Sequence, residues 1–82
     1  MPRYFFHVHD GKNIKDVEGV VLPDCQSARV EAVRLSGAIL KDEARTIASG
    51  GDWHIEVTDE SGLILFQMTF LMIDAPAVER LL

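Results

Sequence analysis

The chain has only one cysteine, Cys25, among its 82 residues. A single thiol cannot close a disulfide within the chain, so we expect a fold without covalent cross-links in a reducing compartment, the cytoplasm. Long apolar runs are lacking too, because Gln67 and Thr69 interrupt the longest one, residues 62–73. That stretch is shorter than the roughly 20 residues of a membrane-spanning helix. Residues 1–3 also lack the charged and then apolar pattern of a leader, so neither a membrane segment nor a signal peptide is expected.

Basic residues are few and scattered. The chain has 8 Lys and Arg against 13 Asp and Glu, and its formal net charge is −5. A nucleic-acid-binding surface needs clustered basic side chains, so no nucleic-acid partner is expected, although an acidic domain can still bind a basic protein. A single domain over residues 1–82 buries only about 60–65% of its unfolded surface, and oligomerisation commonly supplements such a thin core.

Strand-like alternation marks residues 3–9 and 53–59. In each segment the apolar residues at every second position predict a buried face: Tyr4, Phe6, Val8, Trp53, Ile55 and Val57. The opposite face carries Phe5, His7, His9, His54, Glu56 and Thr58. Because side chains alternate across a strand, each group shares one side of its sheet.

A helix is predicted between these strands. Asp24 offers an N-cap, apolar residues then recur at helical spacing, and Gly50 with Gly51 ends the pattern. The predicted helix runs over about 25 residues and carries Cys25 as a buried, small apolar side chain. A second strand is expected within residues 14–22 and a last strand over 63–72, after a turn at 59–62. Asp74 and Pro76 indicate a short C-terminal helix.

These elements predict an α+β fold in the order β-β-α-β-β. Two hairpins joined by a helical crossover form a four-stranded antiparallel sheet in the order 2-1-3-4, packed on one long helix. The first and third strands are then neighbours. The short C-terminal helix completes the fold.

The last predicted strand is apolar on both faces, while one helix covers only one face of the sheet. The surplus predicts a homodimer through the open face, the edge strand or the C-terminal helix. The expected interface residues are Phe5, Leu65, Phe66, Met68, Phe70, Leu71, Val78, Leu81 and Leu82. In the alternative, the C-terminal segment folds back and covers the patch in a monomer.

The histidines are the candidates for chemistry. With the first and third strands adjacent, His7, His9, His54 and Glu56 share the open face, and imidazoles with a carboxylate can bind Zn²⁺. The alternatives are a pH-sensitive or partner-contact role for the histidines and a plain solvated polar face, which is common in antiparallel sheets. The acidic residues fit turns and caps, so no catalytic residue and no cofactor is predicted.

Three stretches together resemble a known family. They are MPRYFFHV with the following DG, the pattern D-x-E-G-V-x-L-P-D with A-R-x-E-A over residues 16–32, and I-x-V-x-D-E-S-G over 55–62. The family comprises small bacterial proteins of similar length and no assigned function. The resemblance implies a stand-alone cytoplasmic bacterial protein and supplies no catalytic residue, and the apolar C-terminal segment is less typical of it.

The leading interpretation is a non-enzymatic protein-interaction module that acts as a homodimer. One alternative is an acidic, antitoxin-like partner of a basic protein, because the strand, the GVVLPD segment and the Ala- and Glu-rich helix are similar to antitoxins of small bacterial toxin–antitoxin pairs. A second alternative is a small metal-binding protein or enzyme that uses His7, His9 and His54.

Overall fold

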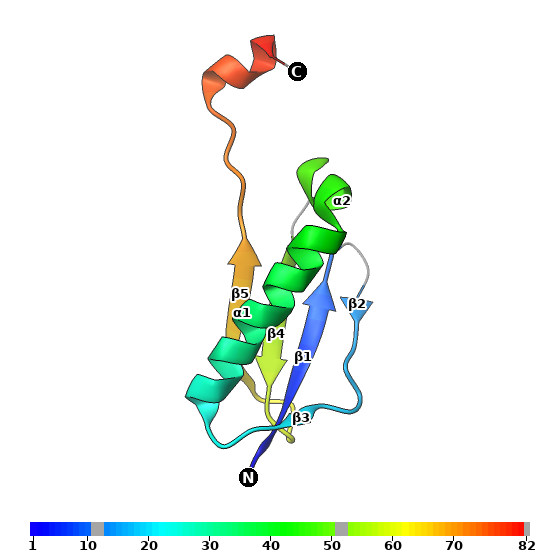
Figure 1. The fold of residues 1–82 in the computed structure, drawn as a ribbon, viewed down its shortest axis with the longest axis vertical. Coiled ribbons are helices and arrows are strands. Elements are labelled where there is room, and N and C mark those ends of the chain that lie inside the picture. Colours follow the sequence, from blue (N-terminus) through cyan, green and yellow to red (C-terminus); the bar gives the residue numbers. More distant parts are fainter. Residues whose placement is uncertain (11–12, 51–52, 82) are drawn as a thin grey trace.

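The computed structural model describes residues 1–10, 13–50 and 53–81 of the chain. These residues form a five-stranded antiparallel sheet with a long helix across one face (Figure 1). In chain order the elements are β1 (Arg3–His9), β2 (Asn13–Ile14), β3 (Val20–Val21), α1 (Cys25–Asp42), α2 (Ala44–Ala48), β4 (Trp53–Thr58), β5 (Ile64–Phe70) and the 3₁₀ helix η1 (Pro76–Arg80). The predicted α+β class is confirmed.

The strand order is β2-β1-β4-β5, with β3 also paired to β1. The predicted neighbour relation of residues 3–9 and 53–59 is therefore confirmed. The predicted four-stranded sheet differs in detail, because the second strand is divided into two short strands. Ile14 pairs with Val8 and Val20 pairs with Tyr4, while residues 15–19 leave the ladder between them. Between these two pairs, the backbone N–H of Phe6 donates to the Asp16 carboxylate, and this bond takes the place of a strand-to-strand hydrogen bond.

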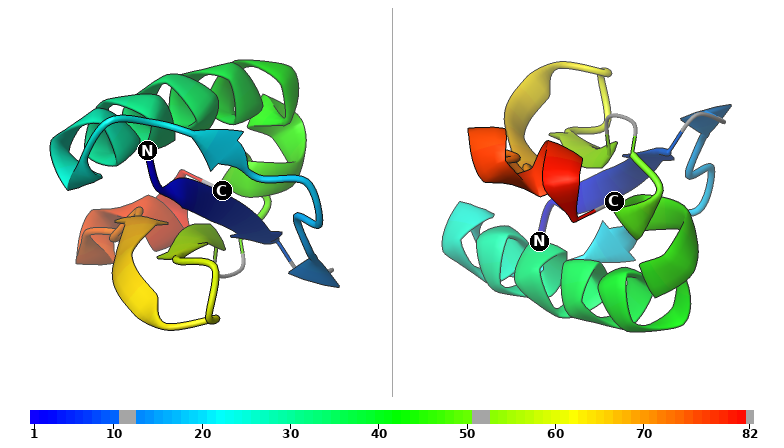
Figure 2. Two further views of the ribbon diagram at one scale, coloured as in Figure 1. Left: turned by 90° about the horizontal axis from the view of Figure 1, so that it is seen from below. Right: turned by 90° about the horizontal axis from the view of Figure 1, so that it is seen from above.

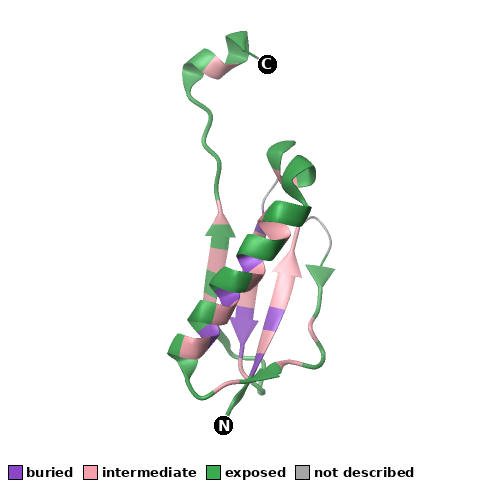
Figure 3. Ribbon diagram, viewed as in Figure 1, coloured by how far each residue is buried: buried purple, intermediate pink, exposed green. Residues whose placement is uncertain are grey.

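The core lies between α1 and the sheet, as the burial colours in Figure 3 show. On the sheet side it contains the predicted apolar faces of β1 and β4, with Ile55 and Val57 fully buried. On the helix side the buried residues are Ala28, Ala32 and Ser36, one turn apart. Their small side chains let the helix lie close to the sheet, and Figure 2 shows the two layers along the long axis of the molecule.

The helical segment differs from its prediction at both ends. Asp24 caps α1 as expected, because its carboxylate accepts the Ser27 N–H at 2.8 Å. The expected single helix is interrupted, however, at Glu43, whose φ of −110° and ψ of 26° leave the helical region before α2 begins. The prediction that Cys25 is buried is wrong: its thiol is exposed in the first turn of α1.

Beyond β5 the chain leaves the body of the molecule (Figure 1). Residues 71–75 pair with no strand. The short 3₁₀ helix η1 follows in place of the expected capped helix, and its N-cap residue, Ala75, makes no side-chain hydrogen bond to it. We call residues 71–81 the C-terminal arm. The arm is mostly apolar, apart from Asp74, Glu79 and Arg80, and it is exposed, with only Val78 half-buried. It makes the molecule 52 Å long against 23 and 21 Å in the other directions.

Candidate functional site

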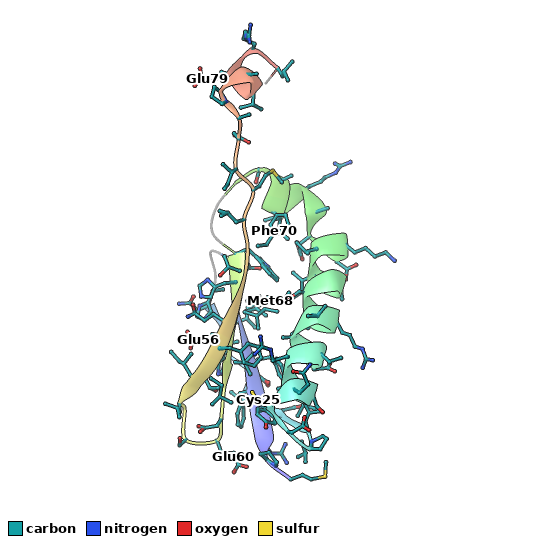
Figure 4. The ribbon with its side chains drawn as sticks, turned by 90° about the vertical axis from the view of Figure 1, so that its left-hand side faces the viewer. Cys25, Glu56, Glu60, Met68, Phe70 and Glu79 are labelled. Atoms are coloured by element: carbon teal, nitrogen blue, oxygen red, sulfur yellow. The ribbon has the colours of Figure 1, made fainter. Side chains whose placement is uncertain are left out.

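The polar side chains of β1 and β4 meet on the sheet face that lies away from α1. His9 pairs with His54 and His7 with Glu56 across the antiparallel ladder. In Figure 4, Glu56 points away from the helix, whereas Met68 and Phe70 lie on the side that faces it. The rings of His9 and His54 are stacked, with centroids 4.5 Å apart and planes 15° from parallel. The predicted adjacency of these histidines is therefore confirmed.

His7 is held by hydrogen bonds on both ring nitrogens. Its Nδ1 accepts the backbone N–H of Asp16 at 3.0 Å, so this nitrogen carries a lone pair. In the neutral ring the proton is then on Nε2, which donates to Thr58 Oγ1 at 3.1 Å. His7 thus fixes the segment between β2 and β3 against the sheet. It has no free nitrogen for a metal ion.

Asp16 forms the other half of this connection. Its carboxylate accepts the backbone N–H groups of Phe6, Glu18 and Gly19, each at 3.1 Å. Partial burial acts to raise the pKa of Asp16, but the three amide donors, aided by His7, outweigh it and hold the pKa below its ordinary value. The carboxylate therefore stabilises the fold in its ionised form.

Gly19 completes the turn around this carboxylate. Its φ is +72°, and a Cβ at this position would lie 2.9 Å from the Tyr4 carbonyl oxygen. In the sequence, an aspartate three residues before a glycine indicates such a turn. The aspartate carboxylate accepts the backbone N–H groups two and three residues further along the chain. The sequence places the acidic residues in turns and caps, but it does not reveal the bond from Asp16 to β1, because that contact depends on strand register.

His9 has a different environment from His7. Its Nδ1 lies 2.7 Å from Asn13 Oδ1, and since an amide oxygen only accepts, Nδ1 is the donor. The lone pair of the neutral ring is then on Nε2, which is buried and has no hydrogen-bond partner. Ligand atoms of His9, His54 and Glu56 all lie within 4.8 Å of one another. The structure thus brings together three of the four predicted metal ligands and assigns His7 to another role.

A hollow of about 320 Å³ adjoins these side chains. It is lined by His7, His9, Asn13, Ile14, Lys15, Glu56, Thr58 and Gly62. Glu56 faces this hollow while its Oε2 accepts the Gln67 side-chain amide at 3.3 Å. His9 and Glu56 therefore border the hollow, while His54 lies outside its lining.

The predicted interface residues lie in three places. Phe66, Met68 and Phe70 are half-buried and pack against the core beneath α1. Phe5 is half-buried on the open face, and Leu65 at the sheet edge is 36% exposed. The arm carries Leu71, Val78 and Leu81, whereas Leu82 lies outside the described residues. Whether these residues form an interface stays a prediction.

A family model described as a domain of unknown function (DUF6894) matches residues 3–71. The chain belongs to this family. The match covers the β1 to β5 body of the DUF6894 fold and ends at Leu71, the first residue of the arm. No curated protein and no solved structure matches the chain. Across the described residues of this DUF6894 member, each helix is too short or too polar to cross a membrane.

Proposed function

We propose that the protein is a non-enzymatic interaction module that acts as a homodimer, with the C-terminal arm of each chain bound along the β5 edge of the other. The observation that carries the proposal is the excess of exposed surface. The chain exposes 6172 Å², whereas a compact monomer of 9.1 kDa exposes about 4,900 Å². The radius of gyration is 14.9 Å, against about 12 Å for a compact domain of this length.

The size of this excess suits a protein interface. It amounts to about 1,300 Å² per chain, and a stable interface of standard size buries about 800 Å² on each partner. The arm contributes to this exposed surface, because Leu71, Met72 and Ile73 are 70%, 59% and 80% exposed. Covering these side chains supplies the hydrophobic free energy that a thin single-domain core lacks.

The edge of β5 is the surface that fits the arm. β5 ends the sheet path, and its sequence ILFQMTF contains no charged residue and no proline. Natural proteins normally protect such an edge with one of these. Ile64 and Leu65 are also exposed there, 52% and 36%. An extended arm can add to this edge as an antiparallel strand, with backbone hydrogen bonds and apolar side chains both satisfied.

A second copy of the chain is the partner that this arrangement favours. One chain carries both an arm and a free edge, so a two-fold axis satisfies two arms and two edges at once. The arm continues β5 along the long axis beyond the end of the sheet (Figure 1), so it reaches another copy more directly than the edge of its own β5. The net charge of −5 suits a basic protein as the further partner of this dimer.

Light scattering on the eluting peak tests the proposal with a matched pair of variants. We expect the wild-type chain to have twice its 9.1 kDa mass and Ile73→Asp to be a monomer, because a buried carboxylate on the arm opposes docking. Val33→Asp, on the exposed side of α1 at 57% exposure, is the control and should remain a dimer. A monomeric wild type at micromolar concentration, or a dimeric Ile73→Asp, would contradict the proposal.

A further inference from the structure

We propose that His9, His54 and Glu56 form a site for a divalent transition-metal ion of the class that imidazole binds well, with Zn²⁺ as the representative ion. The inference concerns one chain and does not depend on the dimer. It begins with His9, whose ring orientation is set before any ion binds. Its Nδ1–H donates to Asn13 Oδ1 at 2.7 Å. A histidine that binds a metal through one nitrogen is typically held in this way by an oxygen acceptor on the other.

The second observation is the buried atom that His9 leaves without a partner. Among the described residues, only His9 Nε2 and Trp53 Nε1 are buried side-chain nitrogen or oxygen atoms with no hydrogen bond. The indole nitrogen is a donor and has no lone pair for a metal ion. His9 Nε2 in contrast has a lone pair, and this nitrogen is what distinguishes the cluster from an ordinary polar face.

The neighbouring donors complete the site. Strand pairing places His54 directly opposite His9, and alternation along β4 places Glu56 on the same face. All three residues are half-buried, and their ligand atoms lie within 4.8 Å of one another. Gln67 donates to Glu56 Oε2, so this carboxylate is also oriented by a neighbour and keeps Oε1 for an ion.

The stacked arrangement must change before the three donors can bind one ion. Zn–N bonds of about 2.1 Å in a tetrahedral site place two donor atoms about 3.4 Å apart. The rings of His9 and His54 are stacked in planes 15° from parallel, with centroids 4.5 Å apart, so their in-plane lone pairs do not converge on one point. No hydrogen bond within the described residues fixes the His54 ring, so rotation of this side chain can turn its nitrogen toward His9.

The donor set indicates the class of ion. Two imidazoles and one carboxylate suit zinc, nickel or copper, whereas magnesium and calcium prefer an all-oxygen shell. Three protein ligands leave a fourth position, which the adjoining hollow of about 320 Å³ opens to water. His7 lines the same hollow but both of its nitrogens are engaged, which makes it the natural control.

Titration of the untagged, metal-free chain with Zn²⁺ against a chromophoric chelator tests the site. We expect one ion per chain, and Co²⁺ in place of Zn²⁺ should give the visible absorption of a low-symmetry site. His9→Ala or His54→Ala should weaken Zn²⁺ binding more than about 100-fold, because loss of an outer-shell partner alone costs about 10–100-fold. Glu56→Gln should also weaken it, while a folded His7→Gln should bind like the wild type.

Asn13→Ala is the variant that keeps the test informative if a histidine variant fails to fold. Asn13 is exposed, so its truncation should preserve the fold, yet it releases the His9 ring and should weaken Zn²⁺ binding about 10–100-fold. The monomeric Ile73→Asp chain should bind Zn²⁺ as the wild type does. Absence of saturable binding, half an ion per chain, or unchanged affinity in both His9→Ala and Asn13→Ala would overturn the proposal.

Discussion

Ile55 and Ile73 have the same side chain and opposite environments. Ile55 lies in the centre of β4 beneath α1 and is 0% exposed, whereas Ile73 lies on the arm and is 80% exposed. The first is covered by Ala28 and Ala32 and by the aromatic residues of the sheet. The second has no covering within its own chain. The comparison teaches that the described residues from β1 to β5 enclose a core of their own, while the arm leaves its apolar side chains exposed, which is what the proposed dimer would cover.

The largest expected effect is on the body. Ile55→Ala removes a fully buried side chain and leaves a cavity, so the free energy of unfolding should fall by about 3–4 kcal/mol. Ile73→Ala is the matched control, and at a protein concentration low enough to separate the proposed dimer it should change that free energy by less than about 0.5 kcal/mol. Urea unfolding of both variants measures the difference. Equal losses in the two variants would show that the arm packs on its own body.

A smaller effect is expected at Asp16, which joins the segment between β2 and β3 to the body. Asp16→Ala leaves the N–H groups of Phe6, Glu18 and Gly19 without their acceptor. The cost should be about 2 kcal/mol, since hydrogen bonds to a charged group contribute about 1.5–3 kcal/mol and this site is partly exposed. Asp16→Asn keeps an acceptor oxygen and should lose less, so equal losses in both variants would count against this assignment.

The same carboxylate predicts a dependence on pH. The pKa of Asp16 is lowered in the folded chain, so its contribution is fully present above the ordinary value of 3.8. It is lost as the pH falls through the lower pKa of the folded state. Acid should therefore destabilise the wild type more than Asp16→Asn over this range, as urea unfolding at stepped pH would measure. A parallel decline of the two proteins would contradict the role of the carboxylate.

Local patterns predicted the parts of the fold that depend on neighbouring residues. Alternation in residues 3–9 and 53–59 identified the buried faces, and connectivity then placed His9 beside His54. The N-cap at Asp24 was also predicted from the sequence, since a cap involves residues close in sequence. Ser36, in contrast, lies at a buried helical position although it is polar. It is accommodated there because its hydroxyl donates to Met68 Sδ at 3.2 Å.

What the sequence did not reveal depends on how the segment between β1 and β3 folds back onto β1. The division of the second strand follows from Asp16, whose bond to Phe6 replaces a piece of ladder. Both histidines lie on one strand, but they have different partners. The contacts of His7 with Asp16 and Thr58 leave it no free ring nitrogen, whereas the contact of His9 with Asn13 leaves Nε2 without a partner. Periodicity assigns both to one face, but only the register tells which ring nitrogen stays free.

The measurement that tests the central claim most directly is amide hydrogen exchange along the arm at high and low protein concentration. If residues 71–75 pair with the β5 edge of a second copy, their amides should exchange slowly at high concentration and rapidly after dilution to monomer. The amides of β4 should stay protected at both concentrations, because the body retains its own core. Rapid exchange of residues 71–75 at high concentration would contradict the account.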